Sequence, residues 1–513
     1  MKNNLKRTFA LLMTLVVMLS VASCSTAPDS ALKGDSYSPN YGYNMSPDSA
    51  GNKGDFSNEG YTEIIENAFI NTLETPNSYF SIDVNTASYP NLRRMIGNGY
   101  TNIPKDSVRV EEMLNYFDYD YKTPTDDSIL ALTSSVFDTP YNEKTKLLTI
   151  GLAAEEIEFS NVNNNLVFLI DVSGSMYSDD KLPLVQQSFS LLVENLNPED
   201  RVSVVTYAGN DSVRLEGAFG YEKEKILAVI EDLQAGGSTA GSKGIETAYN
   251  IASKYFIAGG NNRVILATDG DFNVGLSRTQ DLEEFISEKA KTGVYFSVFG
   301  FGTGNIKADK MESLALKGNG VYSYIDSLNE ADRALVQQIG GSMITVAKDV
   351  KAGIVFNPEY VESYRLIGYE NKMLTQDQFE NSNTDAGEIG SGHTLTVCYE
   401  IVLTDKEFVD GESLADVKIK YKPTENAGGD AECEKELTLA IGTESYHAVP
   451  MGDDAFAAAV VEFALVLRNS EYKGSADLEN LIVRLEAMDL AGDEYKEEFK
   501  NLVKQYYANI TKE

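Results

Sequence analysis

The chain between residues 165 and 301 alternates short apolar runs with stretches of helical periodicity. The apolar runs are "LVFLIDV", "RVSVVTYAG", "RVILATDG" and "VYFSVFGFG". Helix-type patterns lie near residues 183–196, 222–233, 242–256 and 279–291. Strands that alternate with helices in this way are typical of a parallel sheet with helices on both faces. The pattern therefore predicts a doubly wound, mostly parallel α/β domain over residues 161–345.

The segments that flank this domain have other patterns. Before it, "SYFSIDVNTASYPNLRRMIGNGY" predicts a strand and a helix beginning near Ser88, and "ILALTSSVFDTP" and "KLLTIGLAAEEI" predict two strands of an N-terminal flanking module over residues 61–160. After it, "KDVKAGIVFN", "HTLTVCYEIVL", "LADVKIKYKP" and "CEKELTLAIG" alternate with period two, which predicts a β-rich module over residues 346–450.

Residues 451–513 predict a helical C-terminal region. Its first helix places four large apolar side chains on one face: Phe456, Val460, Phe463 and Leu467. Glu462 interrupts the apolar stretch, which is also short for a bilayer. We therefore expect this face to pack against protein rather than to enter a membrane.

The first residues have the pattern of an export signal. A basic start precedes an apolar run from Phe9 to Val21, which is too short for a typical membrane span. The run ends in "VASC", which resembles the bacterial lipobox, and this resemblance implies that residues 1–23 are removed and Cys24 is lipidated. An ordinary cleavage site with an incidental cysteine is the alternative. Residues 24–60, rich in Ser, Asn, Gly, Asp and Pro, predict a flexible tether.

The composition excludes several classes of function. The chain carries 78 acidic and 43 basic residues, a net charge of -35, which argues against nucleic acid as a partner because phosphate contacts need Lys and Arg. Three cysteines and two histidines are too few for a disulfide framework or a histidine-rich metal site. Cys398 and Cys433 lie in neighbouring predicted strands, so one disulfide remains an alternative to two thiols. We expect His393 to be structural.

Hard oxygen donors gather where the predicted strands end. Asp171, Ser173 and Ser175 follow "LVFLI", Thr239 lies in "AGGSTAGS", and Asp269 follows "VILAT". An open α/β sheet places its ligands at the carboxyl ends of its strands, and hydroxyl and carboxylate oxygens suit Mg²⁺, Mn²⁺ or Ca²⁺. Backbone hydrogen bonding within a turn would explain "DVSGS" alone, but not the two later segments.

These five residues resemble the metal-ion-dependent adhesion site of the von Willebrand factor type A (VWA) domain, a Rossmann-like fold. The segments "VRVEEMLNYFDYDY", "GFGTGN", "SYRLIGYENKML" and "DAGEIGSGHT" resemble bacterial VWA-domain lipoproteins of the YfbK type. The resemblance implies that Ser173 and Ser175 bind the metal directly, Thr239 directly or through water, and Asp171 and Asp269 often through water. It also implies Mg²⁺ as the first candidate metal and a protein partner whose acidic side chain completes the coordination.

We therefore expect a binding protein without catalytic residues, lipid-anchored outside the cytoplasm to the cell membrane, or to the outer membrane in a Gram-negative cell. Enzyme motifs fail: the chain has no Gly-x-Ser-x-Gly elbow, "GFGTGN" lacks the dinucleotide spacing, and "DGDFNVG" lacks the required glycine of a calcium loop. The alternatives are a hydrolase that activates water on the metal and a scaffold stabilised by it.

Overall fold

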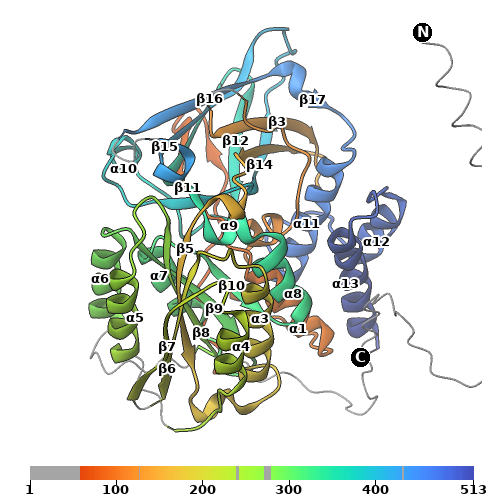
Figure 1. Ribbon diagram of the computed structural model, residues 1–513. Helices are drawn as coiled ribbons and strands as arrows, with labels where there is room; N and C mark the ends of the chain where they lie inside the picture. Colours follow the sequence, from red (N-terminus) through yellow and green to blue (C-terminus); the bar gives the residue numbers. More distant parts are fainter. Residues whose placement is uncertain are drawn as a thin grey trace, which may run out of the picture. The chain divides into compact units, whose positions relative to one another are not determined.

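Three β-sheets organise the computed structural model, which describes residues 58–125, 128–208, 210–237, 242–270, 279–429 and 433–512. One is the predicted parallel sheet, in the order β10-β9-β8-β5-β6-β7 (Figure 1). Its strands are β5 (Asn164–Asp171), β6 (Arg201–Ala208), β7 (Asn210–Phe219), β8 (Asn261–Thr268), β9 (Val294–Phe301) and β10 (Tyr322–Ile325). Neighbouring strands are parallel except β7, which pairs antiparallel with β6 at the edge. The predicted α/β fold is confirmed.

Helices cover both faces of this sheet, each over its own apolar core. One core includes side chains of α3 (Leu182–Glu194), α4 (Lys223–Glu231) and α8 (Leu328–Asp332). The other includes side chains of α5 (Ser242–Lys254), α6 (Thr279–Ala290) and α7 (Ala308–Lys317). All eight residues of β5 and of β8 are buried, as expected for central parallel strands covered on both faces. After α8 a π-helical turn, Arg333–Gln337, and α9 (Ile339–Met343) lead the chain out of the parallel-sheet domain.

The other two sheets combine strands from before and after the parallel-sheet domain. The first has the order β1-β12-β14-β4-β3-β17, and the second has the order β13-β11-β15-β16, with β2 paired to β11. The bounds of the first are Ile70–Asn71, Val361–Ile367, Thr394–Leu403, Lys146–Ala154, Leu130–Asp138 and Tyr446–His447. Those of the second are Gly387–Gly390, Thr345–Phe356, Ser413–Pro423 and Lys435–Gly442, with β2 at Asn77–Ser81. Helix α10 (Gln376–Glu380) lies between β12 and β13 in the chain.

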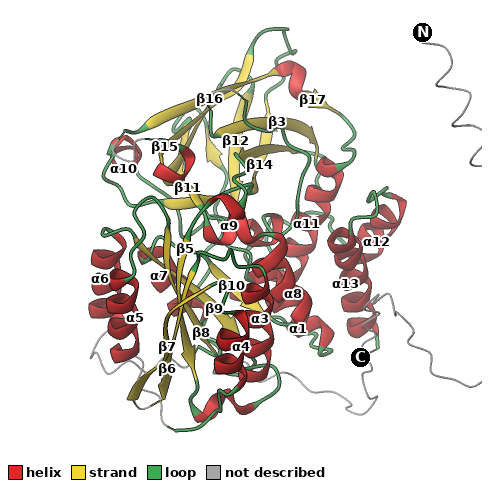
Figure 2. Cartoon of the chain, viewed as in Figure 1, coloured by secondary structure: helices red, strands yellow, loops and turns green. Residues whose placement is uncertain are grey.

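The sequence predicted residues 61–160 and 346–450 as two separate modules on either side of the parallel-sheet domain, but the strand pairing joins them. Strand β4 pairs with β14 over eight residues, and β2 pairs with β11 over five. A hairpin such as β3–β4 is marginally stable alone and gains a sheet by pairing with distant strands. The parallel-sheet domain is therefore inserted between two halves of a shared β-structure, which Figure 2 shows in yellow above it.

The helical C-terminal region packs on the N-terminal helices. Helices α11 (Asp453–Arg468), α12 (Leu478–Ala487) and α13 (Glu494–Thr511) share one apolar core with α1 (Ser88–Gly97) and α2 (Val110–Leu114). The four residues of the predicted α11 face are all buried, and the buried Glu462 forms an ion pair with Arg484. Among the described helices, none is both long enough and apolar enough to cross a bilayer.

Two smaller expectations about side chains are also settled. Cys398 is buried in β14 and Cys433 is exposed just before β16 in the other sheet, and both are free thiols, so the disulfide alternative is wrong. His393 packs against Gly341, and burial together with the charge of Arg333 lowers the pKa of His393 to about 4. A neutral, half-buried imidazole fits the structural role expected for it.

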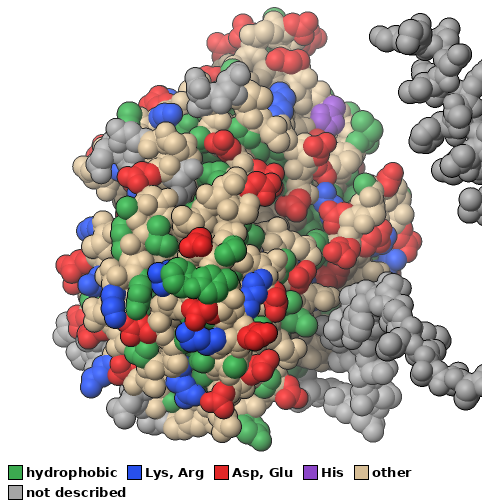
Figure 3. Space-filling model, in the orientation of Figure 1, with side chains coloured by type: hydrophobic (Ala, Val, Ile, Leu, Met, Phe, Trp, Pro, Cys, Tyr) green, Lys and Arg blue, Asp and Glu red, His purple; other side chains and the backbone are tan. Residues whose placement is uncertain are grey.

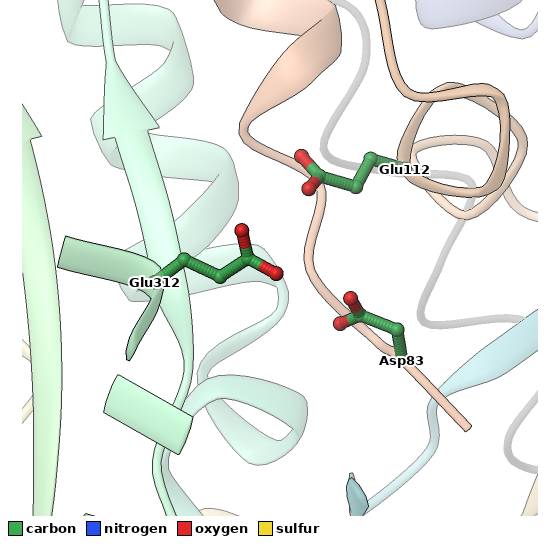
Figure 4. A group of neighbouring side chains, drawn as sticks. All are labelled: Asp83, Glu112 and Glu312. Carbon is green, nitrogen blue, oxygen red and sulfur yellow. The ribbon is translucent and has the colours of Figure 1, made fainter. Parts of the chain in front are cut away.

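A buried charge cluster joins the inserted domain to the rest of the fold. The carboxylates of Asp83, Glu112 and Glu312 point toward one another, with ligand atoms within 4.8 Å (Figure 4). Lys372 Nζ lies 3.0 Å from Asp83 Oδ2 and 3.1 Å from Glu312 Oε1, and Arg109 Nη2 lies 3.2 Å from Glu312 Oε2. Since these cations already face the acids, the cluster is an ionic lock between the inserted domain and its two flanks.

Replacing Lys372 with Met should destabilise the protein strongly. The change leaves Asp83 and Glu312 buried with one cation fewer, and breaking a buried ion pair from one side costs about 3 kcal/mol. Urea unfolding measures the effect, with Lys310→Met, an exposed position on α7, as the control. Equal unfolding midpoints for the two variants would show that the cluster does not hold the fold together.

Candidate metal site

Asp171 is the last residue of β5, where the strand leaves the centre of the sheet. Its side chain is fully buried, and Oδ1 accepts a hydrogen bond from the Ser173 backbone N–H at 2.8 Å. Oδ2 accepts from the Tyr207 hydroxyl on β6 at 3.1 Å and from the Thr268 hydroxyl on β8 at 3.3 Å. The two neighbouring strands therefore fix the orientation of this carboxylate.

Ser173 and Ser175 follow in a tight turn, with their Oγ atoms 3.0 Å apart. Ser173 is buried and Ser175 is exposed, so the pair of hydroxyls lies where the site opens to solvent. The Gly174 N–H donates to the Gly237 carbonyl at 3.2 Å, which holds the described part of the "AGGSTAGS" loop against this turn. Thr239 itself lies outside the described residues.

Asp269 follows β8 directly and is also fully buried. Its Oδ2 accepts hydrogen bonds from Lys181 Nζ at 2.8 Å and from Asn305 Nδ2 at 3.2 Å. Sequence reasoning missed both partners. Asn305 ends the "GFGTGN" motif, whose glycine spacing indicated only a turn, and Lys181 precedes α3 without a recognisable motif.

The two carboxylates differ in their tendency to ionise. Burial, reinforced by the charge of nearby Asp269, raises the pKa of Asp171 to about 6 despite hydrogen bonds from Ser173 and Tyr207. Burial opposes ionisation of Asp269 as well, but hydrogen bonding and the charge of Lys181, with Asn305 and Ser175, hold its pKa below the ordinary value. Among the residues that the structure describes, the site therefore combines two mutually repelling acids with a compensating lysine.

These side chains fit a hard divalent cation. Asp171, Ser173, Ser175 and Asp269 offer only oxygen atoms, and a cation would offset the burial and the charge repulsion that together raise the pKa of Asp171. When bound, the metal would supply a Lewis-acidic position for an oxygen ligand. The described geometry thus brings together four of the five residues that the sequence analysis selected.

Comparison with known proteins gives the family. Three family models match consecutive segments: "von Willebrand factor" over residues 55–149, "von Willebrand factor type A domain" over 165–338, and "Uncharacterized protein YfbK, C-terminal" over 341–508. "Uncharacterized protein YfbK" of Escherichia coli K12 is 38% identical over 470 residues, covering 86% of this chain and 80% of that protein. The chain belongs to the YfbK family of VWA-domain proteins.

Two more distant similarities cover smaller parts of this chain. Human inter-alpha-trypsin inhibitor heavy chain H3 is 26% identical over 229 residues, which are 43% of this chain and 24% of that protein. A solved von Willebrand factor type A structure from Catenulispora acidiphila aligns with 76% of this chain and 91% of its own, with 17% identity and a TM-score of 0.41. Neither similarity assigns a function to this chain.

Metal binding should raise thermal stability through Asp171. A site formed only in the folded state adds about 2.7 kcal/mol when free metal exceeds its dissociation constant a hundredfold. Asp171→Asn keeps an acceptor for Ser173 but removes the charge, so the melting shift caused by Mg²⁺ or Mn²⁺ should largely disappear. Calorimetry with and without metal measures it, and Asp179→Ala, at an exposed position nearby, should keep the shift. A full shift in Asp171→Asn would contradict the assignment.

Proposed function

We propose that this protein is a binding module that engages a protein partner through a divalent cation, Mg²⁺ first, held at the end of the VWA sheet. The observation that carries the proposal is the convergence of Asp171, Ser173, Ser175 and Asp269 at a position that opens to solvent through Ser175. VWA domains are typically protein-binding modules that use such a site. Thr239 is proposed as a further ligand from its place in the sequence.

The charges around the site favour an acidic partner side chain. The hydroxyls of Ser173 and Ser175 would be neutral ligands, and the negative charge of Asp269 is partly neutralised by its ion pair with Lys181. A cation held this way keeps part of its positive charge, so an incoming Asp or Glu carboxylate would bind it well. The face of the molecule in Figure 3 carries many acidic side chains interspersed with basic ones, which agrees with a partner other than nucleic acid.

A hydrolase remains the weaker alternative. Both buried carboxylates already accept hydrogen bonds, Asp171 from Tyr207 and Thr268 and Asp269 from Lys181. The chain's two histidines lie elsewhere, His393 just before β14 and His447 in β17. Water activation would need a base beside the metal that is free to take a proton, and the described side chains at this site favour ligand binding.

Partner capture in Mg²⁺ and in chelator tests the binding function. The wild-type chain should retain a partner from an envelope extract in Mg²⁺ and lose it in EDTA. Ser173→Ala should weaken capture at least tenfold, because it removes one proposed ligand without opening a large cavity. Ser178→Ala, on the exposed part of the same segment, is the matched control. Capture that survives both EDTA and Ser173→Ala would favour the scaffold alternative instead.

We also propose that lipidated Cys24 anchors the protein to the membrane outside the cytoplasm. Cys24 and the proposed tether through residue 57 lie outside the described residues. The described chain begins beside the loop after β9: the Gly60 N–H donates to the Ile306 carbonyl at 2.7 Å, and the Gly304 N–H donates to Glu59 Oε1 at 3.3 Å. This loop also carries Asn305, so the proposed tether joins the fold next to the metal site.

Cys24→Ser should abolish lipidation and block normal removal of the signal peptide. Mass spectrometry of the N-terminus and fractionation of membranes measure the two effects. Cys433→Ser, at an exposed thiol of the folded part, should leave both unchanged. An unmodified Cys24 in the mature wild-type protein would contradict the anchor.

A further inference from the structure

Lys181 is an unusual neighbour for a site that is proposed to bind a cation. Its side chain is 10% exposed, and Nζ donates to Asp269 Oδ2 at 2.8 Å and to Asn305 Oδ1 at 3.4 Å. We propose that Lys181 is a positioning residue that sets the charge of this site, which weakens metal binding and makes the metal-loaded site selective for an anionic ligand. This inference rests on the proposed function, because it concerns the same site.

The backbone and the side-chain stem of Lys181 are both held in place. Its N–H donates to the Ser178 carbonyl at 3.0 Å, and its carbonyl accepts from the Val185 N–H at 2.9 Å in the first turn of α3. The stem crosses Gly302, whose φ is +79°, and a Cβ there would lie 2.4 Å from Lys181 Cγ. Gly302, the second glycine of "GFGTGN", therefore leaves room for the lysine side chain, which gives that motif a role beyond forming a turn.

The net charge of the site decides which ligand it takes. Among the described side chains at the site, Asp171 and Asp269 contribute two negative charges when ionised, and Lys181 contributes one positive charge. A divalent cation then leaves a net charge of about +1, which one carboxylate neutralises. Without Lys181 the loaded site would be neutral, and a carboxylate would make it negative. Lys181 therefore weakens binding of the metal ion but strengthens binding of an anionic ligand to the metal-loaded site.

Two binding measurements on the full-length mature protein separate these effects. The first is calorimetric titration with Mg²⁺: Lys181→Met should bind it about tenfold more tightly than wild type, because a nearby positive charge has been removed. The second is water-proton relaxivity of the Mn²⁺-loaded protein titrated with acetate, which reports loss of metal-bound water. Lys181→Met should need about tenfold more acetate for the same decrease.

Three further variants make the result decisive. Lys181→Arg keeps the charge and should follow wild type in both titrations, whereas Lys181→Gln, a second neutral variant, should follow Lys181→Met and replaces it if that variant does not fold. Lys310→Met, on the exposed side of α7, is the matched control and should change neither. Wild-type metal and acetate affinities in both neutral variants would overturn the role of Lys181 while leaving the metal site intact. Absence of Mg²⁺ binding to the wild type would instead overturn the proposed function on which the inference rests.

Discussion

The candidate metal site depends on two buried carboxylates that lie side by side at the ends of adjacent parallel strands. Asp171 ends β5 and Asp269 follows β8, and the two strands are hydrogen-bonded neighbours. Ionising two neighbouring buried acids has a high free-energy cost unless a positive charge is close to them. Lys181 supplies part of that charge, and a divalent cation would supply the rest. The turn of Ser173 and Ser175, the Gly302 turn and Asn305 all surround this pair.

The rest of the fold connects the domain that carries this edge of the sheet to both of its flanks. The VWA domain is inserted in a β-structure assembled from both flanks, with β4 paired to β14 and β2 to β11. The ionic lock of Asp83, Glu112, Glu312, Arg109 and Lys372 ties α7 to both flanks. The proposed selection of ligands by charge would require fixed distances between the groups of the site, and a domain held at both ends favours such fixed distances.

Periodicity predicted the elements well, because most strands of the parallel sheet contain a continuous apolar run and the helices between them are amphipathic. It missed β7 and β10, since "NDSVRLEGAF" carries charges on an edge strand and "YSYI" is only four residues long. It could not predict that β4 pairs with β14, because a strand pattern records which face is buried but not its partner. The proposed ligand residues Asp171, Ser173, Ser175 and Asp269 were selected from strand-end positions and from family resemblance. Lys181 was missed because its proposed role depends on a tertiary contact with Asp269.

The most direct measurement of the central claim is the anomalous scattering of crystals grown with Mn²⁺. The proposed site predicts a peak within about 2.2 Å of both Ser173 Oγ and Ser175 Oγ, a usual distance for a small hard cation and its oxygen ligands, with Lys181 still beside Asp269. A protein that crystallises in saturating Mn²⁺ with no peak at these hydroxyls would contradict it. A peak among Asp83, Glu112 and Glu312 would instead place the metal in the ionic lock.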